Sequence, residues 1–180
     1  ETLITPSNAW GSDLGSISFW FNTGDIGGDT SDDSDSGAYH SPRAFFAGVS
    51  VADFNVHSTP GWEVGFYTTA VLLGMVDGKV IFRISESNVP KVHFLTTNTY
   101  HDNKWHHVAA SWDNAGNESA LYIDGGSLGD ANKSETMKSF DFDLASDFDF
   151  SGNGLRIGAG SDPGYTGYNG FMDEFSMWEH

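Results

Sequence analysis

The segments "KWHHVAASWD" (residues 104–113) and "SALYIDGG" (residues 119–126) stand on either side of the short stretch "NAGNE". Each segment carries aromatic and aliphatic residues, whereas the stretch between them is rich in Asn and Gly, which form turns. Two such segments with a short turn between them are typical of a β-hairpin. We therefore predict a hairpin here, and the rest of the chain repeats the pattern.

The segment "SISFWFNT" (residues 16–23) predicts a strand by its alternation. Ile17, Phe19 and Phe21 fall on one face of this strand, and Trp20 falls on the other. Because Trp20 is too large to be left in solvent, we expect the strand to be covered on both faces.

The segment "VLLGMVDGKVIFRIS" (residues 71–85) predicts a second hairpin. Its centre is Asp77-Gly78, a pair that favours the type I′ turn of two-residue hairpins. The segment "SFDFDLASDFDF" (residues 139–150) alternates Phe with Asp or other residues, which indicates a charged edge strand, with a weak surface cation site as the alternative. Further strands are predicted over residues 43–51, 62–68, 154–160 and 170–178.

The composition agrees with an all-β domain. The 180 residues include 14 Phe, 6 Trp, 6 Tyr and 22 Gly, and no segment shows a sustained helical stripe of apolar residues. The length suits a single domain over residues 1–180. No stretch approaches the roughly 20 apolar residues of a membrane span, so we expect no direct membrane insertion.

The charge restricts the class of partner. Twenty-five acidic residues against eight basic ones give a net charge of −17, which disfavours nucleic acid and anionic membranes. Such a surface suits saline or calcium-rich surroundings. The chain has no cysteine, which fits a cytosolic protein or a bacterial secreted protein stabilised by metal. Its first residues, "ETLITPSNAW", do not resemble a signal peptide, so we expect the domain to be excised from a larger protein.

Four quoted pieces, "SISFWFNT", "DGKVIFRIS", "NKWHHVAASWDNAGNESALYIDGG" and "LRIGAG…GYNGFMDEFSMW", together resemble the laminin G-like, concanavalin A-like family. The resemblance spans most of residues 16–178. It implies a two-sheet antiparallel jelly-roll sandwich. It also implies carbohydrate or receptor binding, often with calcium at one rim, although a fold alone does not fix a ligand.

The sequence indicates no catalytic site. A retaining glycosidase needs two carboxylates about 5 Å apart, commonly from a Glu-x-Asp-x-x-Glu strand, and the chain has no such pattern. His106 and His107 point to opposite faces of the predicted strand, and no H-x-x-x-H pair completes a zinc site. No G-x-S-x-G motif marks a nucleophilic serine. We therefore expect a module that is not an enzyme.

The stretch "GDIGGDTSDDSDSGAY" (residues 24–39) is the first candidate metal site. It contains five aspartates and no basic residue, and Asp33-x-Asp35-x-Gly37 resembles the start of a calcium loop. It is not an EF-hand, because Ala44 stands where the bidentate Glu would be. The alternative is a solvated polar loop. The candidate ligands for Ca²⁺ are Asp25, Asp29, Asp32, Asp33 and Asp35.

The stretch "GSDPGYTGYN" (residues 160–169) is the second candidate. Asp162 offers a further oxygen ligand for calcium, and Tyr165, Tyr168 and Asn169 offer aromatic faces and an amide that suit a sugar. The alternative is a turn-rich loop whose tyrosines pack against the sandwich.

Together these features predict a calcium-dependent carbohydrate-binding (lectin) domain of a secreted bacterial adhesin or surface protein. The expected partner is a cell-surface or polysaccharide glycan, and the expected oligomeric state is a monomer. Two alternatives stay open: a carbohydrate-binding module attached to a polysaccharide-degrading enzyme, and a structural or protein-binding spacer in which calcium only gives rigidity.

Overall fold

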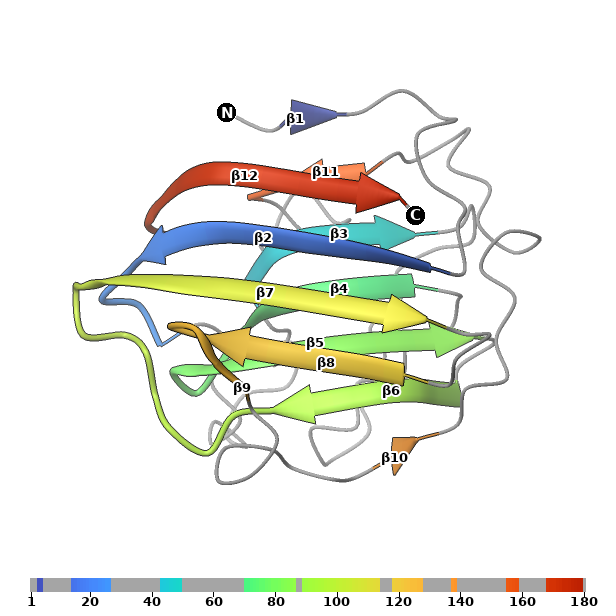
Figure 1. The fold of residues 1–180 in the computed structure, drawn as a ribbon. Helices are drawn as coiled ribbons and strands as arrows, with labels where there is room; N and C mark the ends of the chain where they lie inside the picture. The colour runs from blue at the N-terminus through green and yellow to red at the C-terminus, as the bar shows by residue number, and fades with distance from the viewer. Residues whose placement is uncertain are drawn as a thin grey trace, which may run out of the picture.

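Two antiparallel β-sheets stack face to face to form the domain (Figure 1). The computed structural model describes residues 3–4, 14–26, 43–49, 70–86, 89–113, 118–127, 137–138, 155–158 and 168–179. Within these ranges every regular element is a strand, and there is no helix capable of crossing a membrane. The expected all-β jelly-roll sandwich is confirmed.

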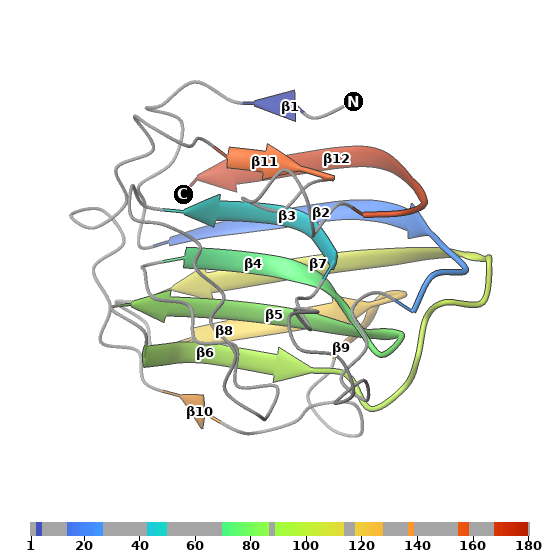
Figure 2. The same ribbon diagram turned by 180° about the vertical axis from the view of Figure 1, so that it is seen from behind.

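The larger sheet has seven strands in the order β1-β11-β3-β4-β5-β6-β10 and faces the viewer in Figure 2. Its strands are β1 (Leu3–Ile4), β3 (Arg43–Val49), β4 (Ala70–Val76), β5 (Lys79–Glu86), β6 (Val89–Leu95), β10 (Met137–Lys138) and β11 (Leu155–Ile157).

The smaller sheet has five strands in the order β12-β2-β7-β8-β9. Its strands are β2 (Leu14–Asn22), β7 (Trp105–Asp113), β8 (Glu118–Ile123), β9 (Gly126–Ser127) and β12 (Phe171–Glu179). The strand β2 pairs with β12 on one side and with β7 on the other, and both pairings are antiparallel. The predicted hairpin of residues 104–126 is the β7–β8 pair.

The core lies between the sheets and is largely aromatic. Alternate residues of β2 and β7 point inward, and aromatic pairs join the two layers. The rings of Phe19 and Phe45 are 5.4 Å apart, and those of Phe82 and Trp112 are 6.2 Å apart. These four side chains are buried, so the aromatic content seen in the sequence is what fills the sandwich.

The expectation that β2 is covered on both faces is wrong, because Trp20 is 37% exposed and packs on His107. The strands covered on both faces lie in the other sheet. Leu72 and Ile81, on the opposite face of β4 and β5 from the core, are also buried. The predicted strands over residues 62–68 and 139–150 lie outside the described residues.

The β4–β5 turn has the geometry predicted for Asp77-Gly78. Both residues have positive φ, 50° and 72°, as a type I′ turn requires. The pair Asp124-Gly125 repeats this geometry between β8 and β9, with φ of 53° and 73°. Both hairpins therefore turn on the sequence signal that predicted the first of them.

The strand β12 forms one edge of the five-stranded sheet, and its ladder is interrupted. The register with β2 shifts between Asp173 and Ser176, and Glu174 has a φ of 52°. The backbone N–H of Glu174 donates to the Asp173 carboxylate at 2.8 Å. A shift of register at a residue with positive φ marks a β-bulge.

Candidate functional site

The candidate site lies at the rim of the sandwich where β2 ends. Because β2 is antiparallel to both of its neighbours, its last residues meet the residues that precede β7 and β12. Three segments far apart in sequence therefore come together there: residues 23–26, 102–104 and 168–170. Figure 1 shows β2 ending beside the starts of β7 and β12.

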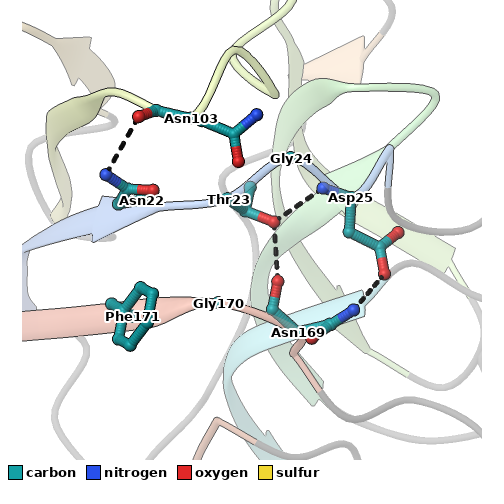
Figure 3. A pocket seen from close by; sticks show the side chains of 8 residues that line it. All are labelled: Asn22, Thr23, Gly24, Asp25, Asn103, Asn169, Gly170 and Phe171. Carbon is teal, nitrogen blue, oxygen red and sulfur yellow. Dashed lines mark hydrogen bonds between the residues drawn. The ribbon is translucent and has the colours of Figure 1, made fainter.

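These segments enclose an open pocket of about 470 Å³. Its surface combines amide side chains, one carboxylate and one exposed aromatic ring (Figure 3). The ring is that of Phe171, which is 70% exposed. The lining residues are Asn22, Thr23, Gly24, Asp25, Asn103, Asn169, Gly170 and Phe171.

Hydrogen bonds fix the pocket before any ligand binds. The buried Thr23 hydroxyl donates to the carbonyl of Asn169 at 2.6 Å and accepts from the N–H of Asp25 at 2.9 Å. The Asn169 side-chain N–H donates to the Asp25 carboxylate at 3.0 Å. The end of β2 and the start of β12 are thus joined by a closed ring of hydrogen bonds.

Asn103 completes the pocket from the β7 side. Its N–H donates to the carbonyl of Thr23 at 3.0 Å, and its carbonyl accepts from the Asn22 side chain at 3.2 Å. Its φ of 60° lies in the left-handed region, which Asn tolerates better than most residues. These bonds hold the Asn22 amide and the backbone of Asn103 in place along this wall.

Tyr168 and Asn169, two residues predicted to contact a ligand, lie differently. Asn169 lines the pocket, whereas Tyr168 packs behind it, with its ring 4.7 Å from that of Phe45. The Tyr168 hydroxyl donates to the carbonyl of Asn22 at 2.8 Å, and burial raises the pKa of Tyr168, so the phenol stays neutral. Tyr168 thus supports the wall that Asn22 belongs to.

The remaining predicted site residues lie outside the described residues. They are Asp29, Asp32, Asp33, Asp35, Asp162 and Tyr165. In the ranges that the structure does describe, no three His, Asp or Glu side chains form a group that could hold a metal ion. Asp25 is the one aspartate of the acidic stretch that lies within the described residues, and it lines the pocket.

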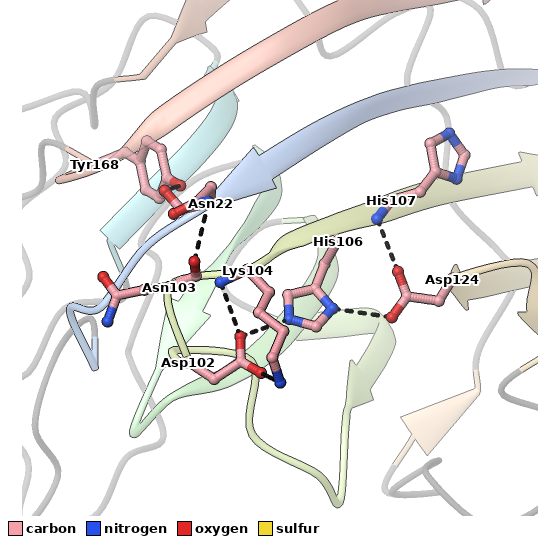
Figure 4. A network of polar contacts seen from close by, with 8 residues as sticks. All are labelled: Asn22, Asp102, Asn103, Lys104, His106, His107, Asp124 and Tyr168. Carbon is pink, nitrogen blue, oxygen red and sulfur yellow. Dashed lines mark hydrogen bonds and ion pairs between the residues drawn. The ribbon is translucent and has the colours of Figure 1, made fainter.

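A polar network stands beside the pocket (Figure 4). His106 lies between two carboxylates, with Nε2 3.0 Å from Asp102 and Nδ1 2.9 Å from Asp124. Asp124 also accepts from the N–H of His107 at 2.9 Å, and Lys104 pairs with Asp102 at 2.7 Å. As predicted, His106 and His107 point to opposite faces of β7: the ring of His106 contacts Phe21 in the core, and that of His107 contacts Trp20 outside.

This arrangement favours a charged imidazolium, because a carboxylate can only accept hydrogen bonds and both ring nitrogens face one. Burial lowers the pKa of His106, but the hydrogen bonds to Asp124 and Asp102 outweigh burial, and the pKa is raised overall. The hydrogen bonds from Lys104 and His106 hold the pKa of Asp102 well below its usual range. The network anchors the segment that carries Asn103 to the β8–β9 turn.

Sequence reasoning missed most of the pocket. The sequence pattern places Asn22 and Thr23 at the end of a predicted strand, and Asn103 and Phe171 at or beside the start of one, without marking a site. The signal that could have found them is the antiparallel pairing of β2 with both β7 and β12, which brings polar strand ends to one rim. That pairing is a property of the fold and not of any local stretch.

The two stacked sheets, with a polar pocket at the strand ends of the five-stranded sheet, define a jelly-roll domain with a rim site. Residues 2–180 match a laminin G family model described as the concanavalin A-like lectin/glucanases superfamily, and the chain belongs to this family. The laminin G-like resemblance found in the sequence is confirmed. A comparison with curated proteins finds no match.

Several solved structures share the fold at low sequence identity. Domains LG4-5 of the mouse laminin alpha1 chain align with a TM-score of 0.55 and 16% identity, over 98% of this chain and 37% of that one. A putative carbohydrate binding protein from Bacteroides ovatus gives 0.58 and 14%, over 98% and 40%. CBM40 of the Ruminococcus gnavus IT-sialidase, bound to alpha2,6 sialyllactose, gives 0.58 and 13%, over 93% and 76%. The chain thus spans about two fifths of the first two proteins and three quarters of the third.

Proposed function

We propose that this domain binds carbohydrate and that the rim pocket is the binding site. The observation that carries the proposal is the composition of the pocket wall: three asparagine side chains and one carboxylate stand beside the exposed ring of Phe171. Sugars present hydroxyl groups in fixed directions and apolar C–H faces. Amides and a carboxylate suit the hydroxyls, and an aromatic ring suits the C–H faces.

The fixed positions of the side chains in the pocket wall support this proposal. The side chains of Asn22, Thr23, Asp25 and Asn169 are held by hydrogen bonds within the protein, so they lose little conformational entropy when a ligand binds. Family membership and the sugar named for the Ruminococcus gnavus relative point the same way. Since that relative is only 13% identical, the transfer of a sugar-binding role to this chain is a proposal and rests on the pocket.

We further propose that binding depends on calcium. Asp25 and Asn169 place a carboxylate and an amide oxygen at the pocket, and Ca²⁺ prefers such hard oxygen ligands. The acidic stretch that Asp25 begins, with Asp29, Asp32, Asp33 and Asp35, and the residue Asp162 would supply the further oxygens. When bound, the ion would order the rim segments and offer coordination positions to sugar hydroxyls.

The pocket favours binding over hydrolysis. Glycoside hydrolysis by the usual mechanisms needs two carboxyl groups facing one sugar bond. Asp25 is the one carboxylate among the described residues that line the pocket, and its carboxylate accepts a hydrogen bond from Asn169. We therefore propose a module that is not an enzyme.

The biological setting is proposed on the composition. A net charge of −17 without cysteine suits a secreted bacterial adhesin or surface protein in a calcium-rich medium. The second candidate is a carbohydrate-binding module of a polysaccharide-degrading enzyme. The observation that favours it is the similarity to the CBM40 of a sialidase, which belongs to an enzyme.

A glycan array probed in calcium and again in excess chelator tests the function. We expect binding in calcium that chelator abolishes. Asn169→Ala and Asp25→Asn should each lose the signal, because both residues line the pocket and bond to each other. Glu118→Gln is the matched control: it also removes a negative charge, but it lies at the far end of the sheet, opposite Asp113. If the wild type binds no glycan in either condition, the proposed function is wrong.

A further inference from the structure

The outer face of the five-stranded sheet carries exposed aromatic side chains. Among the described residues, six large apolar side chains are exposed, and five of them lie at outward positions of this sheet. They are Trp20, Trp105, Tyr122, Phe171 and Trp178. Exposed aromatics that gather on one face mark a contact surface more often than single exposed residues do.

Three strands of the five-stranded sheet place one side chain each in a row on this outer face, at the end of the sheet where the rim pocket lies. Asn22 of β2 pairs with Phe171 of β12 on one side and with Trp105 of β7 on the other. Directly paired residues of neighbouring strands point to the same face, and strands are about 4.8 Å apart, so the row spans roughly 10 Å. Phe171 is 70% exposed and Trp105 is 47% exposed, so both rings are accessible.

The row is continuous with the rim pocket. Asn22 and Phe171 belong to both, since each lines the pocket and each stands in the row. Past Phe171, the next two positions across the strands are therefore Asn22 and Trp105. Figure 3 shows Asn22 and Phe171 on adjacent strands beside the pocket.

We propose that a glycan bound in the rim pocket continues across the row Phe171–Asn22–Trp105, so that the domain takes a neutral oligosaccharide chain and not a single sugar. This proposal rests on the proposed function and deepens it. Two aromatic rings with an amide between them match consecutive sugar rings, whose C–H faces stack on the aromatics while a hydroxyl reaches the amide.

The charge around the row favours a neutral chain over an anionic one. Asp25 lies at the pocket end, and Asp173 lies two residues beyond Phe171 on the same face, opposite Trp20. Lys104 precedes Trp105 in the sequence, and its charge is paired with Asp102 at 2.7 Å. A sialylated or sulfated glycan would meet carboxylates here, and the net charge of −17 would add to that repulsion.

The test is titration calorimetry with ladders of neutral oligosaccharides, from the monosaccharide to the hexasaccharide, of arabinan, xylan, mannan, α-glucan and β-glucan. For the ladder that binds, we expect the affinity to rise as the chain grows beyond one unit. Trp105→Ala should weaken binding of the longer members about tenfold and leave the monosaccharide unchanged, since one stacking contact is lost.

Trp178→Ala is the matched control. Trp178 is also 47% exposed and lies on the same face, but it pairs with Ser16 at the opposite end of β2. We expect its affinities to equal those of the wild type. Because both tryptophans are exposed, both variants should fold, and unchanged melting temperatures would verify this.

The failures of the two proposals differ. If no ladder and no array glycan binds, the proposed function is wrong and the row has no role in glycan binding. If the monosaccharide binds as tightly as the hexasaccharide, or if both tryptophan variants behave alike, the extension is wrong while the pocket stands. Tighter binding of sialylated than of neutral ladders would overturn the neutral class. Self-association of the wild type that Trp105→Ala abolishes would make the row an interface between copies and overturn the proposal.

Discussion

The hydroxyl of Thr23 donates a 2.6 Å hydrogen bond to the carbonyl oxygen of Asn169, a residue 146 positions away in the chain. The same hydroxyl accepts from the N–H of Asp25, and Thr23 is buried. One side chain thus sets the distance between the two segments that carry the pocket carboxylate and an amide.

Replacing Thr23 with Val tests this relationship, since Val has a similar shape without the hydroxyl. We expect Thr23→Val to lower the free energy of unfolding by about 1–3 kcal/mol, because the N–H of Asp25 and the carbonyl of Asn169 lose a buried partner. Denaturant unfolding measures this change. Thr23→Ser keeps the hydroxyl and should lose clearly less, so equal losses in the two variants would contradict the role of the hydrogen bonds.

The pH dependence of stability should report His106. Its pKa is raised above the ordinary 6.5, so the folded state holds its proton more tightly than the unfolded state does. The stabilisation is therefore full below pH 6.5 and is lost as the pH rises through the raised pKa. The groups that face the ring are Asp102 with its partner Lys104, Asp124 and the phenol of Tyr100.

His106→Gln should remove this loss of stability above pH 6.5. The measurement is the free energy of unfolding across a pH series for the variant and the wild type. His107→Gln is the control, since the ring of His107 lies outside on Trp20 and not between the two carboxylates. An identical pH profile for His106→Gln and the wild type would show that the two carboxylates do not hold the proton.

His93 should act in the opposite direction. It is buried, and burial followed by the charge of Arg83 lowers its pKa to about 4. The unfolded state therefore binds the proton first as the pH falls, and stability is lost between pH 6.5 and pH 4. Between pH 7 and pH 4 the stability of the wild type relative to His93→Gln should fall by on the order of 3 kcal/mol. A constant difference over this range would mean that folding does not lower the pKa of His93.

The glycines of the two hairpin turns allow the cost of a steric collision to be separated from the cost of backbone strain. Gly78 and Gly125 have nearly equal φ, 72° and 73°, so Ala should be strained at both. A Cβ at Gly78 would also collide with the His101 ring, whereas at Gly125 nothing lies within 4 Å. Gly78→Ala should therefore cost at least about 1 kcal/mol more than Gly125→Ala, measured by thermal unfolding. Equal costs would mean that the His101 ring moves aside freely.

Calcium should stabilise the domain if the acidic stretch binds it. An ion bound only by the folded state, at a concentration one hundred times its Kd, adds about 2.7 kcal/mol, so chelator should lower the melting temperature. Replacing Asp33 and Asp35 together with Ala, or Asp162 with Ala, should reduce this effect and abolish glycan binding while the β-sheet spectrum stays. Tyr165→Ala should weaken glycan binding and keep the calcium effect. If chelator does not change the melting temperature, these aspartates do not bind calcium.

Local patterns predicted the framework of the fold. Alternation located β2, β3, β7, β8 and β12, and the Asp77-Gly78 pair located the turn between β4 and β5. The strand β6, which contains Pro90, was not predicted. Pro90 is accommodated where the β5–β6 register shifts, between Ile84 and Ser85, so its missing N–H falls at an irregularity of the ladder.

The site was harder to predict because its residues meet only through strand register. Asn169 was identified from its local context and lines the pocket. Asn22 and Asn103, 81 positions apart, are joined by a hydrogen bond that no local pattern encodes. The exposure of Trp20 could not be predicted either, because large apolar residues are buried on average.

The bulge in β12 has a consequence for how copies of this domain meet. An edge strand presents unpaired N–H and C=O groups that could template a strand from another molecule. At Asp173 and Glu174 the bulge bends that template, turns one N–H back onto its own chain and sets two negative charges along it. The bulge therefore hinders a strand of another molecule from pairing along the whole of this edge. Many copies of the domain can therefore stand close together without their sheets joining into aggregates through β12.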